Sequence, residues 1–291
     1  MIRRVLILKI LITGAKGMLA QAVISKFKKE NELILTDSQQ LDITDLDCVL
    51  KNVSDVKPDC IINCAAYTAV DKAEEDEELA KKVNGIGPRN LAIASKQNDS
   101  LLVHISTDYV FPGDLEITKE YVEEDATGPV TAYGRTKLLG EQEVQKNCDK
   151  YYIFRTAWLY GQGKNFVRTM LNLGKTHNEV NVVCDQHGSP TYTEDLANII
   201  YQAIDKNIPY GIYHSTNQGF TTWSEFAKNI FELLNMKTKV NPITSEEYSK
   251  LFPSSANRPK NSKLSKDKLL SFGIEIPNWK NALERYLKEQ E

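Results

Sequence analysis

A tyrosine and a lysine four residues apart offer a pair of groups for acid–base chemistry. Tyr133 and Lys137 fall within a helix-period segment, so both side chains lie on one helix face. A nearby ammonium group stabilises a phenolate and lowers the pKa of tyrosine from its reference value of about 10. Such a phenol can protonate a carbonyl oxygen as hydride arrives, or accept a proton in the reverse direction. We therefore predict that Tyr133 and Lys137 are catalytic.

A threonine at the end of an apolar run supplies a third group. Thr107 follows the run 101–106, at the edge of the predicted sheet where substrate should lie, and its hydroxyl can orient the reacting oxygen. A second pair with the same spacing, Tyr160 and Lys164, has two glycines inside it, which disfavour a helix. We therefore predict the catalytic set Thr107, Tyr133 and Lys137.

A glycine pair near the N-terminus has the setting of a phosphate-binding loop. Gly14 and Gly17 follow the first apolar run and open a helix, where backbone N–H groups can approach a pyrophosphate. Asp37 ends the second apolar run about 20 residues later, the expected place for a carboxylate that binds the adenosine ribose. This pattern predicts a nicotinamide dinucleotide, NADH or NADPH. Asp37 favours NADH because it repels a 2′-phosphate, and Lys16 partly offsets that preference.

Strands and helices that alternate along the chain must hold these candidate site residues in position. Such an order predicts an α/β fold with a Rossmann-like, doubly wound parallel sheet that binds ligands at the carboxyl ends of its strands. The predicted strands are 5–12, 33–36, 60–64, 101–106, 152–156 and 211–216. The predicted helices are 18–29, 46–53, 75–97, 131–145, 165–174, 193–205, 222–234 and 279–289.

The domain organisation is predicted to be discontinuous. A chain of 291 residues suits one large domain or two smaller ones, and no low-complexity linker marks a boundary. We assign residues 1–160, with a return at 193–217, to a dinucleotide-binding domain. Residues 161–192 and 218–291 are assigned to a smaller α/β domain that binds the substrate.

The composition excludes several classes of protein. With 36 basic and 39 acidic residues, the net charge is −3, so the composition lacks the excess of positive charge expected of a nucleic-acid-binding protein. No stretch approaches the roughly 18 apolar residues of a membrane span, so we expect no membrane partner and a cytoplasmic location. The five cysteines and four histidines form no metal-ligand motif, and we predict no metal site.

Longer sequence blocks resemble the dTDP-4-dehydrorhamnose reductase family, a branch of the extended short-chain dehydrogenase/reductases. The resemblance covers essentially the whole chain. The blocks are TGAKGML (13–19), LDITD (41–45), NCAAYTAVDKAE (63–74), STDYVF (106–111), YGRTK (133–137), RTAWLYG (155–161), GSPT (188–191) and RPKNS (258–262).

The resemblance implies a role for each matching position. For the cofactor it implies contacts from Gly14, Gly17, Met18, Leu19, Asp37, Asp42, Ile43, Ala65, Ala66, Tyr67, Tyr133 and Lys137. For the sugar nucleotide it implies contacts from Thr107, Asp108, Trp158 and Arg258. It also implies reduction of a dTDP-linked 4-keto-6-deoxy sugar to dTDP-L-rhamnose, a precursor of cell-surface polysaccharide, and the pairing of two copies as a homodimer.

Two other functions stay open on the sequence. The chain could be a sibling reductase for another nucleotide-linked 4-keto sugar, or a non-catalytic regulatory subunit that retains the dinucleotide fold. A sugar-nucleotide dehydratase is disfavoured, because those enzymes resemble this fold but carry Thr-Asp-Glu where this chain has Thr107-Asp108-Tyr109.

Overall fold

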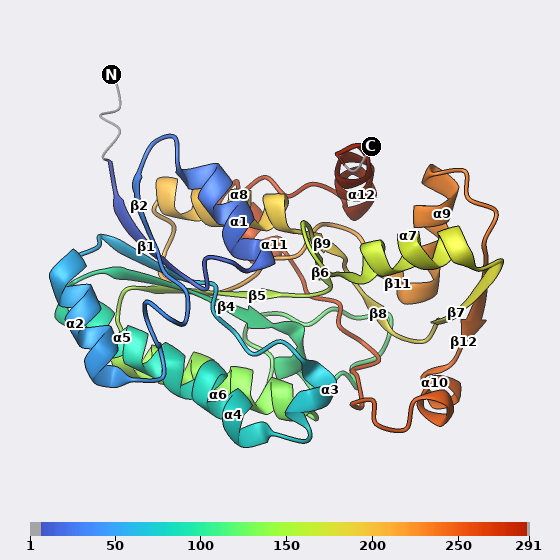
Figure 1. The fold of residues 1–291 in the computed structure, drawn as a ribbon, viewed down its shortest axis with the longest axis horizontal. Helices are drawn as coiled ribbons and strands as arrows, with labels where there is room; N and C mark the ends of the chain where they lie inside the picture. The colour runs from blue at the N-terminus through green and yellow to red at the C-terminus, as the bar shows by residue number, and fades with distance from the viewer. Residues whose placement is uncertain (1–6, 290–291) are drawn as a thin grey trace.

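A six-stranded parallel sheet forms the centre of the molecule, as a computed structural model covering residues 7–289 shows (Figure 1). Across the sheet the strands are β2 (Glu32–Leu35), β1 (Lys9–Thr13), β3 (Cys60–Asn63), β4 (Leu101–Thr107), β5 (Tyr151–Thr156) and β10 (Gly211–His214). β1 pairs in parallel with both β2 and β3, so the direction in which successive strands are added to the sheet reverses at β1. The predicted doubly wound α/β fold is confirmed. Residues 5 and 6 of the first predicted strand lie outside the described residues.

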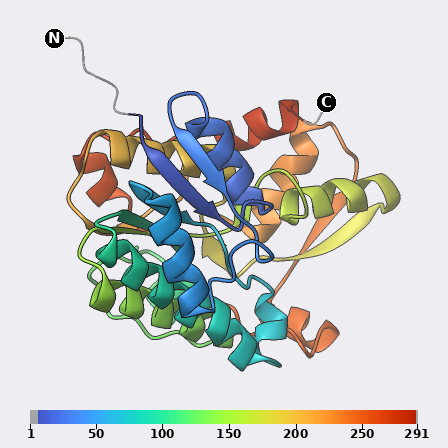
Figure 2. The same ribbon diagram turned by 60° about the vertical axis from the view of Figure 1, so that its left-hand side comes forward.

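Both faces of this sheet are covered by helices, because its strands are apolar on both sides (Figures 1 and 2). On one face, Ile10 and Ile12 of β1 share a core with α1 (Met18–Phe27) and α8 (Thr193–Asp205). On the other face, Leu11 packs in a core with α2 (Leu46–Val56), α5 (Gly87–Gln97) and α6 (Ala132–Asn147). This two-sided burial keeps the carboxyl ends of the strands in fixed positions.

The helix predicted over 75–97 is interrupted. The structure has a short helix α3 (Val70–Ala73), then α4 (Glu77–Lys81), a π-helical segment Lys82–Ile86, and α5. The prediction of one regular helix was therefore wrong. The π-helical turn shifts Asn84 out of the register of a regular helix, and its side chain bonds the backbone of Tyr67.

A second, smaller group of elements lies beside the carboxyl end of the sheet (Figure 1). Helices α7 (Phe166–Thr176), α9 (Trp223–Leu233) and α12 (Trp279–Lys288) share an apolar core that includes Val167, Phe226 and Leu283. A parallel pair, β7 (Glu179–Val183) and β12 (Lys239–Ile243), completes it. Sequence reading missed both strands. Pro242 lies within β12 and is tolerated there, because both strands of a two-stranded sheet are edge strands.

Short pairings join the smaller group to the main sheet. β6 (Leu159–Tyr160) pairs with β9 (Thr191–Tyr192), and β8 (His187–Gly188) pairs with β11 (Thr221–Thr222). Two further helices, α10 (Ser245–Leu251) and α11 (Asp267–Ser271), were not predicted. Among residues 7–289, no helix is long and apolar enough to cross a bilayer.

The chain returns to the main sheet twice after leaving it. α8 packs against α1, and β10 pairs with β5 at the sheet edge. Near the C-terminus, Leu269, Ile274 and Ile276 enter the core on the α1 side of the sheet. The main sheet and its core are therefore assembled from distant parts of the chain.

Candidate active site

Two adjoining cavities run along the carboxyl ends of the central strands. The larger has a volume of about 510 Å³ and the smaller about 420 Å³. Gly17, Cys64, Ala65 and Ala66 line both, so the two cavities form one groove across the ends of β1 and β3. This is the point where the strand order reverses, as expected for a ligand site in an open α/β sheet.

The glycine loop forms the floor between the two cavities. Gly14 has a φ of +62°, and a Cβ there would lie 2.8 Å from the Ala65 Cα, so only glycine fits. Gly17 is the N-cap of α1, and no side chain caps this helix. The free N–H groups of its first turn, beginning at Met18, therefore stay available to an anion.

The smaller cavity has the groups expected around an adenosine. Asp37, Asp42 and Ile43, which the resemblance implies as cofactor contacts, line it. The Lys16 Nζ lies 2.5 Å from an Asp37 carboxylate oxygen. The hydrogen bond from Lys16 and those from backbone N–H groups hold the pKa of Asp37 below its usual range. A carboxylate and an ammonium group thus share the position where a ribose or a 2′-phosphate would bind.

The loop after β3 is held by the π-helical turn. Asn84 Oδ1 accepts from the Tyr67 N–H at 2.9 Å, and Asn84 Nδ2 donates to the Tyr67 carbonyl at 3.0 Å. Ala65 and Ala66 line the groove, whereas Tyr67 is not among the lining residues. The Tyr67 side chain instead packs with Ala73, Ala80, Ala132 and Tyr133. Tyr67 therefore supports the wall of the groove from behind.

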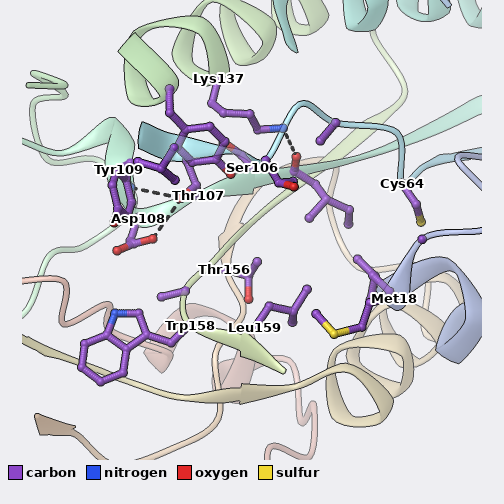
Figure 3. A pocket seen from close by; sticks show the side chains of 18 of the residues that line it. Met18, Cys64, Ser106, Thr107, Asp108, Tyr109, Lys137, Thr156, Trp158 and Leu159 are labelled. Atoms are coloured by element: carbon purple, nitrogen blue, oxygen red, sulfur yellow. Dashed lines mark hydrogen bonds between the residues drawn. The ribbon is translucent and has the colours of Figure 1, made fainter. Parts of the chain in front are cut away.

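The three predicted catalytic residues line the larger cavity, and Figure 3 shows Thr107 and Lys137 there. Thr107 ends β4, whereas Tyr133 and Lys137 lie in the first half of α6, which Thr131 caps by accepting from the Gly134 N–H. The Thr107 hydroxyl is close enough to Tyr133 to lower the pKa of its phenol in part. Lys137 is buried and donates to the Ile105 carbonyl at 2.6 Å. The structure thus brings together a phenol, a hydroxyl and an ammonium group.

Burial controls the protonation of this set. Apolar surroundings raise the pKa of Tyr133, and the negative charge of Asp108 raises it further. Burial lowers the pKa of Lys137 to about 8, partly offset by Glu141. The expected lowering of the Tyr133 pKa by Lys137 is not seen, because burial outweighs it and the ammonium group points to a carbonyl. Tyr133 is therefore a protonated phenol at neutral pH, the form that can donate a proton.

Asp108 lies next to this set and is nearly inaccessible. Its Oδ1 accepts from the Thr107 hydroxyl at 2.9 Å. Burial raises the pKa of Asp108 to about 6, against the lowering effect of the nearby Ser262 and Thr107 hydroxyl groups. The carboxylate is ionised at neutral pH and fixes the orientation of the Thr107 hydroxyl.

Trp158 and Arg258, both implied as contacts of the sugar nucleotide, are placed differently. Trp158 lines the larger cavity next to Thr107 and Asp108. Arg258 does not line it, and its guanidinium donates to both Asp71 carboxylate oxygens, at 2.8 and 3.0 Å. The segment that carries Arg258 is thereby tied to α3 at the side of the site.

Several lining residues were not singled out from the sequence. Asn63 and Thr156 end β3 and β5, and Ser106 precedes the last residue of β4, positions that the strand-end rule could have flagged. Lys164, which belongs to the second Tyr–Lys pair noted in the sequence, also lines the larger cavity, whereas Tyr160 is buried in the core of the smaller group. The glycines at 161 and 163 do prevent a helix there, as predicted, so the two side chains separate.

Beneath the cavity is a buried ion pair that sequence reading also missed. Glu141, one turn after Lys137, accepts from Arg155 Nε at 2.9 Å and Nη2 at 2.8 Å. It also accepts from the Ser106 hydroxyl at 2.5 Å. This pair joins α6, β4 and β5 directly behind the catalytic residues.

Comparison with known proteins places the chain in a family. A family model described as "RmlD substrate binding domain" matches residues 8–291. The dTDP-4-dehydrorhamnose reductase of Mycolicibacterium smegmatis is 41% identical over 281 residues, covering 95% of this chain and 84% of the relative. The spore coat polysaccharide biosynthesis protein SpsK of Bacillus subtilis is 39% identical over 284 residues, covering 97% and 98%.

Solved structures agree with this. A dTDP-4-dehydrorhamnose reductase from Clostridium acetobutylicum has a TM-score of 0.93 at 48% identity, covering 97% of this chain and 99% of its own. The Bacillus anthracis enzyme, solved in complex with NADP, has a TM-score of 0.92 at 42% identity, covering 98% and 100%. By sequence over nearly its full length, and by fold, this chain belongs to the dTDP-4-dehydrorhamnose reductase family.

Proposed function

We propose that this chain is an NAD(P)H-dependent reductase that converts the C4 keto group of dTDP-4-dehydrorhamnose to the hydroxyl of dTDP-L-rhamnose. The observation that supports this best is the meeting of Thr107, Tyr133 and Lys137 at one end of a groove. The other end of the groove has the glycine loop and Asp37. Membership of the family agrees with this reaction.

The groove fits a nicotinamide dinucleotide. Gly14 leaves space where a Cβ would collide, the first turn of α1 offers free N–H groups, and the smaller cavity has a carboxylate for ribose hydroxyls. The proposed contacts are Gly14, Gly17, Met18, Leu19, Asp37, Asp42, Ile43, Ala65, Ala66, Tyr133 and Lys137. A bound reduced nicotinamide supplies the hydride. The relative from B. anthracis, solved with NADP, supports the same class of cofactor here.

The protein's own groups supply the proton and the orientation. Tyr133 holds a proton at neutral pH and donates it to the sugar oxygen as the C4 carbon is reduced. Thr107 donates its single hydroxyl proton to Asp108 in this structure, and we propose that it turns this proton to the same oxygen when the sugar binds. Lys137, buried next to Tyr133, stabilises the phenolate that remains.

The Lys16–Asp37 pair suits either form of the cofactor. Asp37 accepts from ribose hydroxyls and repels a 2′-phosphate, which tilts the preference toward NADH. Lys16, 81% exposed at its side chain, can leave Asp37 and pair with a 2′-phosphate instead. We propose that the protein accepts both cofactors, with NADH slightly favoured.

The substrate end lies toward the smaller group of elements. We propose that Asp108 and Trp158 contact the sugar nucleotide, and that residues 161–192 and 218–291, of which Lys164 lines the larger cavity, form the substrate-binding part. Arg258 reaches the substrate only if it leaves Asp71. The name of the B. subtilis relative supports a role for the product in polysaccharide biosynthesis.

A panel of nucleotide-linked 4-keto sugars, assayed by NADH and NADPH absorbance, tests this function. The dTDP-4-dehydrorhamnose substrate should give stoichiometric oxidation of the reduced cofactor and the highest kcat/KM. A faster reaction with another nucleotide or sugar would identify a sibling reductase. Cofactor binding with no turnover of any keto sugar would instead favour a regulatory subunit.

A further inference from the structure

Trp158 has an unusual backbone conformation for a bulky residue. Its φ is +49°, in the left-handed region that L-residues with large side chains rarely enter. The surrounding chain imposes this conformation. The Trp158 carbonyl accepts from the Thr191 N–H at 3.1 Å, and the next residue begins β6, which pairs with β9. Strained residues of this kind concentrate at functional sites, where the neighbouring structure holds them in place.

The Trp158 indole is fixed on one face by a second tryptophan. The rings of Trp158 and Trp223 are stacked with centroids 3.8 Å apart and planes inclined by 14°. Trp223 begins α9 in the smaller group and is itself supported by Phe166, the first residue of α7, at 4.6 Å. Trp223 does not line the cavity, so it acts on the cavity only through Trp158.

A glycine restricts the same indole from a second direction. A Cβ on Gly188 would lie 2.8 Å from Trp158 Cε2, 3.0 Å from Cζ2 and 3.1 Å from Nε1. Gly188 is paired with Thr221 in the β8–β11 ladder, and Thr222 in the same ladder is the N-cap of α9. The ladder therefore holds Gly188 and Trp223 in register around one side chain.

We infer that Trp223 and Gly188 are positioning residues that fix the Trp158 indole as a rigid wall at the substrate end of the cavity. This inference rests on the proposed function for the identity of the sugar nucleotide. An indole held in this way loses little side-chain freedom when a sugar or base packs against its open face. Residues from the smaller group thereby determine substrate binding without touching the substrate.

Steady-state kinetics of four variants test this inference. Trp223→Leu should raise KM for the keto sugar by roughly threefold to tenfold, the range for loss of an aromatic pair, with kcat within about twofold. Gly188→Ala, which displaces the indole, should raise KM in the same way. Trp223→Phe should restore a KM close to that of the unmodified protein. Tyr201→Leu is the matched control, because it removes an aromatic pair with Phe27 that involves neither Trp158 nor Trp223, and its KM should be unchanged.

Two further readouts separate positioning from general damage. Circular dichroism should show an exciton couplet from the stacked indoles that both Trp223 variants abolish, whereas binding of NADPH should be the same in all variants. An unchanged KM in Trp223→Leu, or an equal rise in Tyr201→Leu, would overturn the inference. If Trp223→Leu does not fold, Gly188→Ala decides in the same assay.

Binding of dTDP-L-rhamnose, measured by calorimetry, separates this inference from the proposed reaction. Unmodified protein that binds the product more tightly than Trp223→Leu, yet reduces no ketone, would support the positioning role and contradict the reaction. Protein that reduces the ketone with equal affinities in both forms would support the reaction and overturn the positioning role. Protein that does neither would overturn both.

Discussion

Glu141 and Arg155 form a bidentate ion pair that is almost completely hidden from solvent, at 2.9 and 2.8 Å. Arg155 also donates to the Glu123 carbonyl and lies 5.0 Å from the centre of the Phe111 ring. The pair therefore connects the helix that carries Tyr133 and Lys137 with two strands of the main sheet. Because this pair lies directly behind Tyr133 and Lys137, stability and catalysis both depend on the Glu141 carboxylate.

Removal of this carboxylate should destabilise the protein. We expect Glu141→Gln to lower the free energy of unfolding by about 3 kcal/mol, because it leaves the Arg155 charge buried without its partner. Urea denaturation would measure this. Glu77→Gln is a matched control, since it breaks the half-exposed pair with Arg135 on the same helix and should cost less than about 1 kcal/mol. Equal losses in the two variants would contradict the expectation.

Tyr133→Phe should remove the proton donor and keep the fold. We expect turnover to fall by about 10²–10⁴-fold, the range for general acid catalysis, with cofactor affinity little changed. Stopped-flow or steady-state NADH oxidation would measure this. Tyr160→Phe provides the control, because within the described part of the chain the Tyr160 hydroxyl is buried without a hydrogen-bond partner. Full activity in Tyr133→Phe would refute the assignment of the acid.

Activity should decline at alkaline pH. Lys137 has a pKa of about 8, below the ordinary lysine value, so it is cationic below pH 8 and neutral above it. Because the ammonium group is the form that stabilises the Tyr133 phenolate, kcat/KM should fall about tenfold per pH unit above that value. A pH profile with the cofactor saturating would show this limb. A profile that stays level to about pH 10 would mean that Lys137 need not be charged.

Lys16→Ala should shift the preference between cofactors. Without this ammonium group, Asp37 repels a 2′-phosphate unopposed, so KM for NADPH should rise about tenfold more than KM for NADH. The comparison is made at low ionic strength, where an exposed charge acts most strongly. Lys29→Ala changes the net charge equally at an exposed site outside both cavities and should leave the ratio of the two KM values as it was.

Local patterns explain what the sequence could predict. Gly14, Asp37 and Thr107 follow strand-like runs, and Tyr133 and Lys137 share one helix face, so short-range spacing was sufficient to locate them. The Glu141–Arg155 pair and the Trp158–Trp223 stack join segments that only the fold brings together. The protonation of Tyr133 was misjudged for the same reason, because burial depends on the whole packed structure and outweighs one neighbouring charge.

Irregular segments were the harder part of the fold. The π-helical turn that carries Asn84 has apolar residues spaced much like an ordinary helix, so periodicity gave no warning. The strands β7 and β12 are short and lie in a two-stranded sheet, where exposed polar residues and Pro242 weaken the usual signal. Context from partner strands, rather than residue type, decides these elements.

The distribution of the main sheet along the chain affects how the protein is made. Its edge strand β10 contains residues 211–214, and Leu269, Ile274 and Ile276 complete the core on one face. During synthesis, which proceeds from the N-terminus, the first five strands emerge well before these residues do. The edge of β5 therefore stays unpaired until residues 211–214 have emerged, and one apolar sheet face stays incomplete until Leu269, Ile274 and Ile276 follow. Chaperone demand is therefore expected to persist until these later segments have left the ribosome.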